Sequence, residues 1–560
     1  MTAPDRCWLA LSYLLSGTLG ACSFSSPDPA ADAATGAPAQ PGPANDVLGA
    51  PTLDGARARC AVSKLAPRTL RRLTRQELGN AIRDVFPTIA AQWSGVDLGP
   101  DPISPLGFGN DSSTLLVGEQ TAREILATAK DVASLVTDSA HLAAILPCAA
   151  TTADDACGGA FVDAFGPRLY RRPLTADERA ELVASFRSVS ARAGFALGIK
   201  WTLIAMLQSP AFIYRAELGG AAGKLDQYEV ATELAFTYGG STPSSDLLAK
   251  AASGALGTPD AVAAEARALL ATQPGQDALM QFFREWSGYE RVLGADRAGA
   301  AEFPTLVAPF LAEETRRFLE AVVFTGSGGV KDLLTTSTTF LDVNLATFYG
   351  YGAGVTDFAS VQRPAGRGIG LLAQASILAS RSHYDFTSPT FRGLFVYAQL
   401  LCRQPLARPL GVPAVQDAPA ADTTRERYET QHAHGGCAAC HQLFEPFGYG
   451  LEQFDAVGRY RVNENGYPID THAVVTLDGS TKLEFDGLED LATKLADLPE
   501  VTDCVSGLLA SYVFGGAGGQ TCLAEDGRTS LAQGQFGLRD FYLSLATSPS
   551  FAARLVSSAP

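Results

Sequence analysis

The sequence predicts a mainly α-helical protein, and two observations carry this prediction. Apolar residues recur at helical spacing behind several N-terminal capping signals, whereas few stretches alternate with the period of two that a half-buried strand requires. Of the 560 residues, 46% are hydrophobic and 18% are charged, which excludes global disorder and allows large apolar cores. We therefore expect a multi-helical body, a smaller helical module after it, and one short β-hairpin.

Several helix starts are marked by residue pairs that satisfy the first backbone N–H groups of a helix. These capping boxes are Thr74 with Glu77, Thr175 with Glu178, and Asp226 with Glu229. Pro259 occupies a first helical position, and residues 311–324 carry apolar and charged side chains on opposite sides of a helix. The best hairpin candidate is 474–485, with Asp478-Gly479 as its turn.

The N-terminus has the pattern of an export signal. Arg6 precedes an apolar run that is too short to span a bilayer, and Leu19-Gly20-Ala21-Cys22 resembles the lipobox of bacterial lipoproteins. This resemblance implies cleavage before Cys22 and acylation of Cys22; the alternative is an ordinary signal peptide with a chance cysteine. We expect a lipoprotein of the cell envelope, facing the periplasm or the outer membrane, whose membrane contact is the N-terminal lipid anchor alone.

The segment Cys437-Ala-Ala-Cys440-His441 matches the attachment pattern of a c-type haem. Two thiols on one turn of backbone can reach the two vinyl groups of one haem, and the adjacent His441 then ligates the iron. The competing interpretations are a thioredoxin-like dithiol, which requires a βαβ context, and half of a zinc site, which requires a second ligand pair. Neither requirement is met in the sequence, so we expect one covalent haem c.

The opposite iron ligand is left open by the sequence. Five of the six histidines lie between His383 and His472, and no methionine follows Met280. The sixth position is therefore a histidine, a methionine from another domain, or vacant. The candidates are His383, His432, His434, His472, Met206 and Met280. Of these, His383 is the residue that we name as a metal ligand beside His441.

Cysteine parity predicts three disulfides. Of the ten cysteines, Cys7 is removed with the signal peptide, Cys22 carries the lipid, and Cys437 and Cys440 bind the haem. Six cysteines remain, which is an even number. We expect the pairs Cys148–Cys157 across a short polar loop, Cys504–Cys522, and Cys60–Cys402 as the remainder. The alternative is six buried free thiols, which an oxidising compartment disfavours.

Composition and these motifs together suggest a division of the chain. Its parts are a lipoprotein signal peptide (1–21), a disordered tether (22–62), helical domains (63–150, 151–220 and 221–360), a segment ending in a Pro-rich connector (361–421), the haem module (422–480) and a C-terminal helical domain (481–560).

Several segments in this order resemble the multi-domain planctomycete-type cytochrome c proteins, most of whose domains have no known function. The segments are LRRLTRQELGNAIRDVFP (70–87), RLYRRPLTADERAEL (168–182), LIAMLQSPAFIYRAELG (203–219), GIGLLAQASILASRSHYDFTSPTFRGLFVYAQLLC (368–402) and TRERYETQHAHGGCAACHQLFEPFGYGLEQFDAVGRYR (424–461). The resemblance spans about 65–550, and it implies export, a helical body and one covalent haem, but no known reaction.

By position, the resemblance assigns Cys437 and Cys440 to the haem links and His441 to the proximal ligand. It also implies a cofactor-binding role for Pro446, near which a backbone carbonyl accepts the imidazole N–H of the ligand. Arg392 and Arg459 lie in matching segments and are expected at the haem propionates, with ordinary ion pairs to Glu452 and Asp455 as the alternative.

Three functions fit these features. The first is single-electron transfer at the cell envelope to a redox partner protein that the sequence does not identify. The second is a haem oxidoreductase of peroxidase type with an open sixth position, and the third is an envelope binding protein with an ancillary haem. A net charge of −16, from 43 basic and 59 acidic residues, argues against nucleic acid as a partner.

Overall fold

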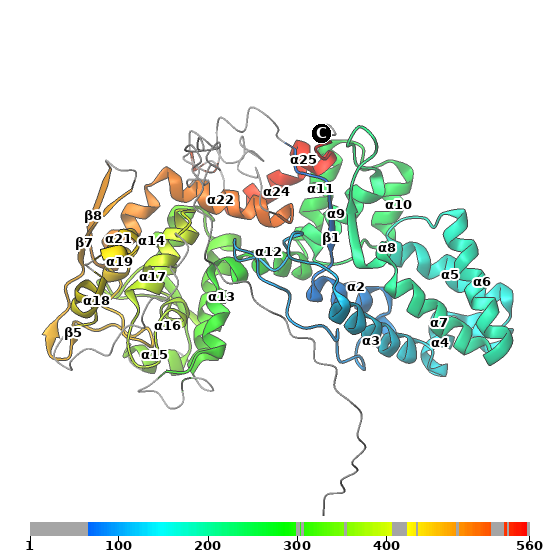
Figure 1. Cartoon of the computed structure of the whole chain (residues 1–560), viewed down its shortest axis with the longest axis horizontal. Helices are drawn as coiled ribbons and strands as arrows, with labels where there is room; N and C mark the ends of the chain where they lie inside the picture. Colours follow the sequence, from blue (N-terminus) through cyan, green and yellow to red (C-terminus); the bar gives the residue numbers. More distant parts are fainter. Residues whose placement is uncertain are drawn as a thin grey trace, which may run out of the picture. The chain divides into compact units, whose positions relative to one another are not determined.

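Helices dominate the computed structural model, in agreement with the expected fold class (Figure 1). The structure describes residues 65–297, 303, 307–351, 356–405, 423–432, 435–477, 481–516, 531, 533–534 and 537–556. The expected signal peptide, the lipid site Cys22 and most of the tether and the Pro-rich connector lie outside these residues. Within the described ranges, no helix combines the length and the apolar character that crossing a bilayer requires.

The N-terminal half contains most of the long helices. They are α2 (Arg75–Val85), α3 (Glu119–Val136), α4 (Ser139–Ile145), α5 (Asp155–Tyr170), α6 (Ala176–Ala193), α7 (Phe195–Gln208), α8 (Pro210–Ile213), α9 (Gln227–Gly239), α10 (Ser245–Ser253), α11 (Pro259–Leu270) and α12 (Gln273–Ser287).

The C-terminal half contains helices of very different lengths, of which α22 and α13 are the longest. They are α13 (Ala308–Glu320), α14 (Val330–Thr335), α15 (Val343–Tyr349), α16 (Ala375–Ser380), α17 (Pro389–Phe395), α18 (Thr424–His432), α19 (Gly435–His441), α20 (Glu445–Tyr449), α21 (Gly487–Ala496), α22 (Pro499–Val513), α24 (Leu538–Ser544) and α25 (Pro549–Ala552). Short 3₁₀ or π segments are η1 (Pro87–Ile89), η2 (Pro147–Ala150), η3 (Tyr289–Gly294), η5 (Ala321–Thr325), η6 (Leu371–Ala373), η7 (Val396–Leu400) and η9 (Leu545–Thr547).

The sequence-predicted helix starts are confirmed. Both hydrogen bonds of the capping box form at Thr74, Thr175 and Asp226, which begin α2, α6 and α9. Pro259 is the first residue of α11, and the amphipathic stretch forms α13 and the π segment η5.

Among the described residues, four two-stranded antiparallel sheets interrupt the helices, where the sequence predicts one hairpin. The predicted hairpin is present as β7 (His472–Thr476) and β8 (Lys482–Asp486), with Val474 opposite Glu484 (Figure 1). Its expected turn residues, Asp478-Gly479, lie outside the described residues. The other pairs are β1 (Thr69–Arg72) with β2 (Tyr214–Glu217), β3 (Thr338–Leu341) with β4 (Ala359–Gln362), and β5 (Asn463–Glu464) with β6 (Tyr467–Pro468).

Two apolar cores organise the described residues. One core joins side chains from Leu73 to Ile213 together with Phe236, and so holds α2 to α8. The second core takes the helices from α9 to α25, the haem-motif region and the β7–β8 hairpin. Met206 belongs to the first core and Met280 to the second, and both are buried.

Two disulfides lie within the described residues. Cys148–Cys157 forms as predicted. Cys402, however, is bonded to Cys504, so the expected pairs Cys504–Cys522 and Cys60–Cys402 are wrong. Helix α22 packs against η7 and brings Cys504 beside Cys402, although 102 residues separate them in the chain. Cys60 and Cys522 lie outside the described residues.

The two disulfides should differ in their contribution to stability because they close loops of different length. Replacing Cys402 and Cys504 by Ser should lower the free energy of unfolding by about 4–5 kcal/mol, against about 2.5–3 kcal/mol for the same change at Cys148 and Cys157, in the chain-entropy description. Urea unfolding of both double variants measures the difference. An equal loss in the two variants would contradict the expectation.

The haem-motif region packs against a helix that precedes the Pro-rich connector. A Cβ atom on Gly393 of α17 would lie 1.9 Å from the carbonyl oxygen of Phe444, and one on Gly448 of α20 would lie 2.0 Å from that of Pro389. The backbones of α17 and α20 therefore touch, which only glycine allows at these two positions. Residues 389–395, which the sequence analysis places ahead of the haem module, thus share its packing.

Candidate haem-attachment site

The haem motif is carried by α19. Cys437 and Cys440 are both free thiols and both half-buried. They stand three positions apart on the helix and His441 follows directly, so the three side chains share one region of the helix surface. The motif therefore presents two reduced sulfurs and an imidazole together, as attachment of a c-type haem requires.

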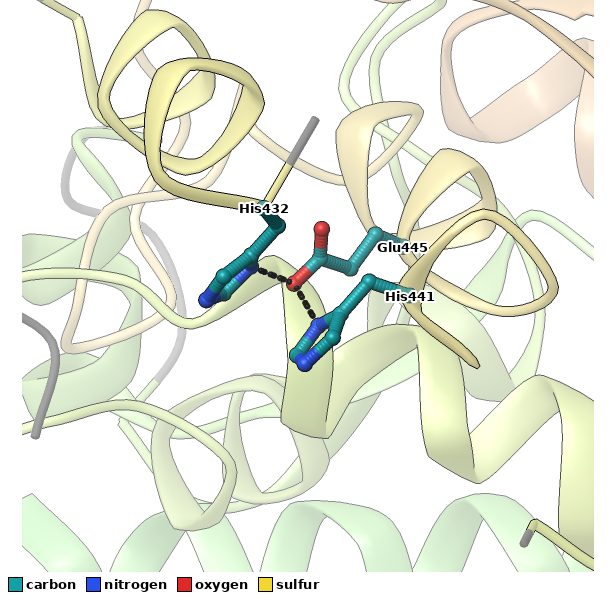
Figure 2. A group of neighbouring side chains, drawn as sticks. All are labelled: His432, His441 and Glu445. Atoms are coloured by element: carbon teal, nitrogen blue, oxygen red, sulfur yellow. Dashed lines mark hydrogen bonds and ion pairs between the residues drawn. The ribbon is translucent and has the colours of Figure 1, made fainter. Parts of the chain in front are cut away.

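His441 is held by a buried carboxylate. Its Nδ1 lies 2.6 Å from Oε1 of Glu445, and the side chain of Glu445 is 3% exposed. The Nδ1 of His432 lies 2.7 Å from the same oxygen. The two imidazoles stack, with ring centroids 3.7 Å apart and 29° between the planes. Figure 2 shows both rings turned with Nδ1 toward Glu445.

Glu445 receives further hydrogen bonds. The hydroxyl of Thr390, from α17, also donates to Oε1, and the hydroxyl of Tyr449 donates to Oε2 at 3.2 Å. Burial alone would raise the pKa of Glu445, but the hydrogen bonds from His432, His441 and Thr390 outweigh it and lower the pKa below its ordinary value. Glu445 is therefore an ionised carboxylate inside the protein.

The ionised state of Glu445 fixes the tautomer of both histidines. An ionised carboxylate only accepts hydrogen bonds, so Nδ1 must carry the proton in each ring. The lone pair is then on Nε2, which points away from Glu445 in both residues (Figure 2). His441 thus offers Nε2 as a metal ligand while a carboxylate orients the ring and raises its basicity.

The hydrogen-bond acceptor differs from the one that the sequence analysis expects. Pro446 stands near the start of α20, and its carbonyl oxygen accepts from the N–H of Gly450 rather than from His441. The acceptor is the Glu445 side chain, one residue earlier. The spacing of the two residues could have indicated this contact. Glu445 follows His441 by four positions, and side chains four positions apart on helical turns come within reach of each other.

His432 does not stand opposite His441. The two ligands of one haem iron approach it from opposite sides, whereas the free nitrogens of His432 and His441 point to the same side. In this arrangement His432 shares the carboxylate that His441 contacts, and its role as a sixth ligand stays a prediction. The ligand atoms of His432, His441 and Glu445 lie within 4.8 Å of one another, so the same group can also hold a small metal ion.

The other sixth-ligand candidates are placed as follows. His383 is half-buried between the rings of Phe386 and Phe391, and its Nε2 lies 3.1 Å from the hydroxyl of Tyr428. Tyr428 in turn contacts the ring of His432 edge-on. His383 is thus two side chains from His441, and its role as a ligand stays a prediction.

His472, on β7, is more than half exposed and pairs with Glu484. His434 lies outside the described residues. Met206 is in the first core, away from the core that contains Phe444 and Phe447, so it does not face the haem motif.

The two arginines expected at the propionates have different surroundings. Arg392 is 1% exposed, and its terminal nitrogens donate to the turn after α20 and to Ser382. With an ion pair to Glu452 at 3.5 Å, it fits the structural alternative and has no terminal N–H left for a propionate. Arg459 is about half exposed and pairs with Asp455, and its contact with a haem propionate stays a prediction.

Residues that the sequence did not indicate come from two segments, α17 and α20. Glu445 orients the proximal histidine, and Thr390 on α17 and Tyr449 on α20 complete its hydrogen bonds. Thr390 is 55 positions from Glu445 in the chain, so no local pattern connects them. The half-zinc interpretation also loses its cysteine partners, because Cys402 and Cys504 are bonded to each other.

Family models match the chain at four places. They are PSD3, a protein of unknown function (DUF1587), at 71–138; PSD5, of unknown function (DUF1595), at 157–217; PSD4, of unknown function (DUF1592), at 225–351; and PSCyt3, of unknown function (DUF1588), at 367–464. The last match contains α17, the haem motif and Glu445. A search of curated proteins and a search of solved structures gave no match.

Proposed function

Because the chain belongs to the planctomycete cytochrome c-type multi-domain family, we propose that it carries one covalent haem c on Cys437 and Cys440, with His441 as its proximal ligand. The observation that carries this proposal is the hydrogen bond from His441 Nδ1 to the buried Glu445, which leaves Nε2 open beside two free thiols. When bound, such a haem supplies a one-electron couple of its iron.

The residues present fit this group. Two thiols are reduced and unpaired, the imidazole is in the tautomer that binds iron, and its second nitrogen has a partner. Half-burial of the motif also leaves the attachment face open to a second protein. The function that these features support best is single-electron transfer to a partner protein.

A peroxidase-like oxidoreductase is the second candidate, and one observation favours it. A proximal imidazole bonded to an ionised carboxylate is electron-rich, and such a ligand favours the higher oxidation states of the iron. The third candidate, a binding protein with an ancillary haem, requires a ligand site away from the haem motif.

Absorption spectra of the oxidised and reduced protein, matured with haem, separate these functions. A six-coordinate, low-spin haem in both states supports electron transfer, and a five-coordinate haem that shifts on adding cyanide supports the enzyme. A pyridine test that finds no covalent haem would contradict the proposal. Zinc or another metal in stoichiometric amount, with no haem, would instead assign His432, His441 and Glu445 to a metal site.

The charge of Glu445 should lower the reduction potential of the haem protein. In Glu445→Gln the acceptor is neutral, which destabilises the ferric state more than the ferrous state. A loss of about 1.5–3 kcal/mol for a hydrogen bond to a charged group corresponds to a rise of about 60–130 mV for one electron. A redox titration measures it.

Glu429→Gln is the matched control for this titration. Glu429 is on the adjacent helix α18 and is about half exposed, so its replacement should leave the potential within a small fraction of that rise. If Glu445→Gln and Glu429→Gln raise the reduction potential equally, the change comes from the loss of a negative charge anywhere near the haem, and the hydrogen bond of Glu445 to His441 does not set the potential.

We also propose export and anchoring through acylated Cys22. The two disulfides support an oxidising compartment for the folded part of the chain. Mass spectrometry of the N-terminal peptide from the membrane fraction tests this, and an unmodified cysteine or an uncleaved leader would contradict it.

A further inference from the structure

A cleft lined by arginines lies outside the haem-motif region. Its volume is about 640 Å³, within the range of small-molecule sites. Six arginines line it: Arg71, Arg75, Arg83, Arg215, Arg284 and Arg291. We call it the arginine cleft. No lining residue falls between 292 and 511, so the cleft shares none with the haem motif.

Two of these arginines are buried and face each other across the β1–β2 sheet. Arg71 is directly opposite Arg215 in the strand register, and the two residues are 1% and 2% exposed. Like charges in such a position destabilise a sheet, and burial increases the cost. Glu217 compensates in part, with Oε1 at 3.3 Å from Arg71 and 2.8 Å from Arg215. The Nε atom of both arginines has no acceptor among the described residues.

Glu217 is shared with a third cation. Its second oxygen lies 2.9 Å from Arg554, which also pairs with Glu233. Burial raises the pKa of Glu233 to about 7, so this carboxyl is only partly ionised at neutral pH. Glu217 is thus the common partner of three buried guanidinium groups, while Glu77 also pairs with Arg215 and Glu233 with Arg554.

Three exposed arginines at the rim of the cleft have no carboxylate partner in the described ranges. Arg75, Arg83 and Arg291 are exposed, and none forms an ion pair with the part of the chain that the structure describes. Arg83 lies over the ring of Trp93, 5.1 Å from its centroid. The positive charge of these three arginines is therefore not offset by an ion pair within the described residues.

The acidic side chains that line the cleft interact with groups other than the guanidiniums of Arg75, Arg83 and Arg291. Glu77 accepts from the backbone of Thr74 and pairs with Arg215, and Asp101 pairs with Arg72, which does not line the cleft. Glu285 accepts from the N–H of Gly109 and from Gln281, and its burial raises its pKa. Glu290 is 3.7 Å from Arg284. These acids therefore do not neutralise the rim arginines.

We propose that the arginine cleft binds a small organic carboxylate. The planar guanidinium fork matches a carboxylate, as it does a phosphate, in two parallel hydrogen bonds. The choice of an organic ligand over an inorganic anion rests on the aromatic lining of the cleft. Tyr512 and Tyr542 also line the cleft, so the rest of the ligand meets ring surfaces rather than water alone. The third candidate function above thereby acquires a specific site, but the proposal does not depend on the haem.

Calorimetry on the full mature chain tests the proposal, with benzoate, succinate, inorganic phosphate and chloride as probes at constant ionic strength. We expect saturable binding of benzoate or succinate, weakened about tenfold in Arg83→Gln, as the loss of one charge-assisted hydrogen bond predicts. Arg83 is exposed, so this variant should fold. The control is Arg123→Gln on α3, where the side chain is 71% exposed and does not line the cleft.

Three results would overturn the proposal. The first is that neither carboxylate binds. The second is that phosphate binds as tightly as the better of the two carboxylates. The third is that Arg123→Gln weakens carboxylate binding as much as Arg83→Gln does. Because none of these measurements reads the haem, a negative result here leaves the haem proposal standing, and absence of covalent haem leaves this one standing.

Discussion

A chain with Cys437→Ala and Cys440→Ala, matured with haem, is expected to retain no covalent haem. The two thiols are the sulfurs of the motif, and both are free in the structure. His441 and Glu445 remain, so any haem that still binds is held only through the iron. Acid-acetone extraction should therefore strip the variant and leave the haem on the unchanged protein, as a haem stain of a denaturing gel shows directly.

The control for this pair is Ala439→Ser. Ala439 lies between the cysteines in sequence and is exposed, so a hydroxyl there should leave covalent haem at the level of the unchanged chain. Covalent haem that survives in the double variant would mean that the attachment residues are others.

Replacing Glu217 by Gln is expected to lower the free energy of unfolding by about 3–5 kcal/mol. Burial alone would raise the pKa of Glu217, but Arg215, Arg71 and Arg554 together lower it to about 2. The neutral amide would leave these buried cations without their common counter-charge. Urea unfolding at pH 7 measures the loss.

The same pKa shift sets the pH dependence of this loss. Because the pKa of Glu217 is lowered by folding from its ordinary value of 4.5, its contribution is complete above that value and disappears as the pH falls toward about 2. The stability difference between the unchanged chain and Glu217→Gln should therefore shrink over this interval. A difference that is constant with pH would show that the amide acts through packing.

Glu119→Gln is the surface control for Glu217→Gln. Glu119 is 80% exposed and pairs with the exposed Arg123, so its replacement should change stability by less than about 0.5 kcal/mol. A comparable loss at both positions would contradict the idea that the buried charges need Glu217.

Local sequence patterns predicted much of the fold. Thr74, Thr175 and Asp226 each precede a glutamate by three positions, and this spacing alone places the start of a helix. The alternation around Val474 similarly predicted the β7–β8 hairpin. These signals suffice because the interacting groups lie within one turn or one hairpin.

Contacts between distant segments were not predictable. Cys504 is bonded to Cys402 and not to Cys522, which is nearer in sequence and which we expected as its partner. The packing of α22 determines which cysteine lies beside Cys504. The β1–β2 pairing likewise joins Arg71 to Arg215, two residues that no short pattern relates. At the Cys437–His441 motif, the role of the two thiols and His441 in haem attachment stays a prediction, and the carboxylate oxygen that contacts His441 became visible only in the structure.

The contact between Gly393 and Gly448 has a consequence for what can be excised or exchanged as a unit. A fragment that begins at 422, where composition suggests a boundary, would contain the whole attachment motif but lose the helix against which α20 lies. It would also lose Thr390, one of the donors to Glu445. The smallest fragment that keeps the motif in its packing must therefore start before residue 389, upstream of the Pro-rich connector at which composition alone would divide the chain.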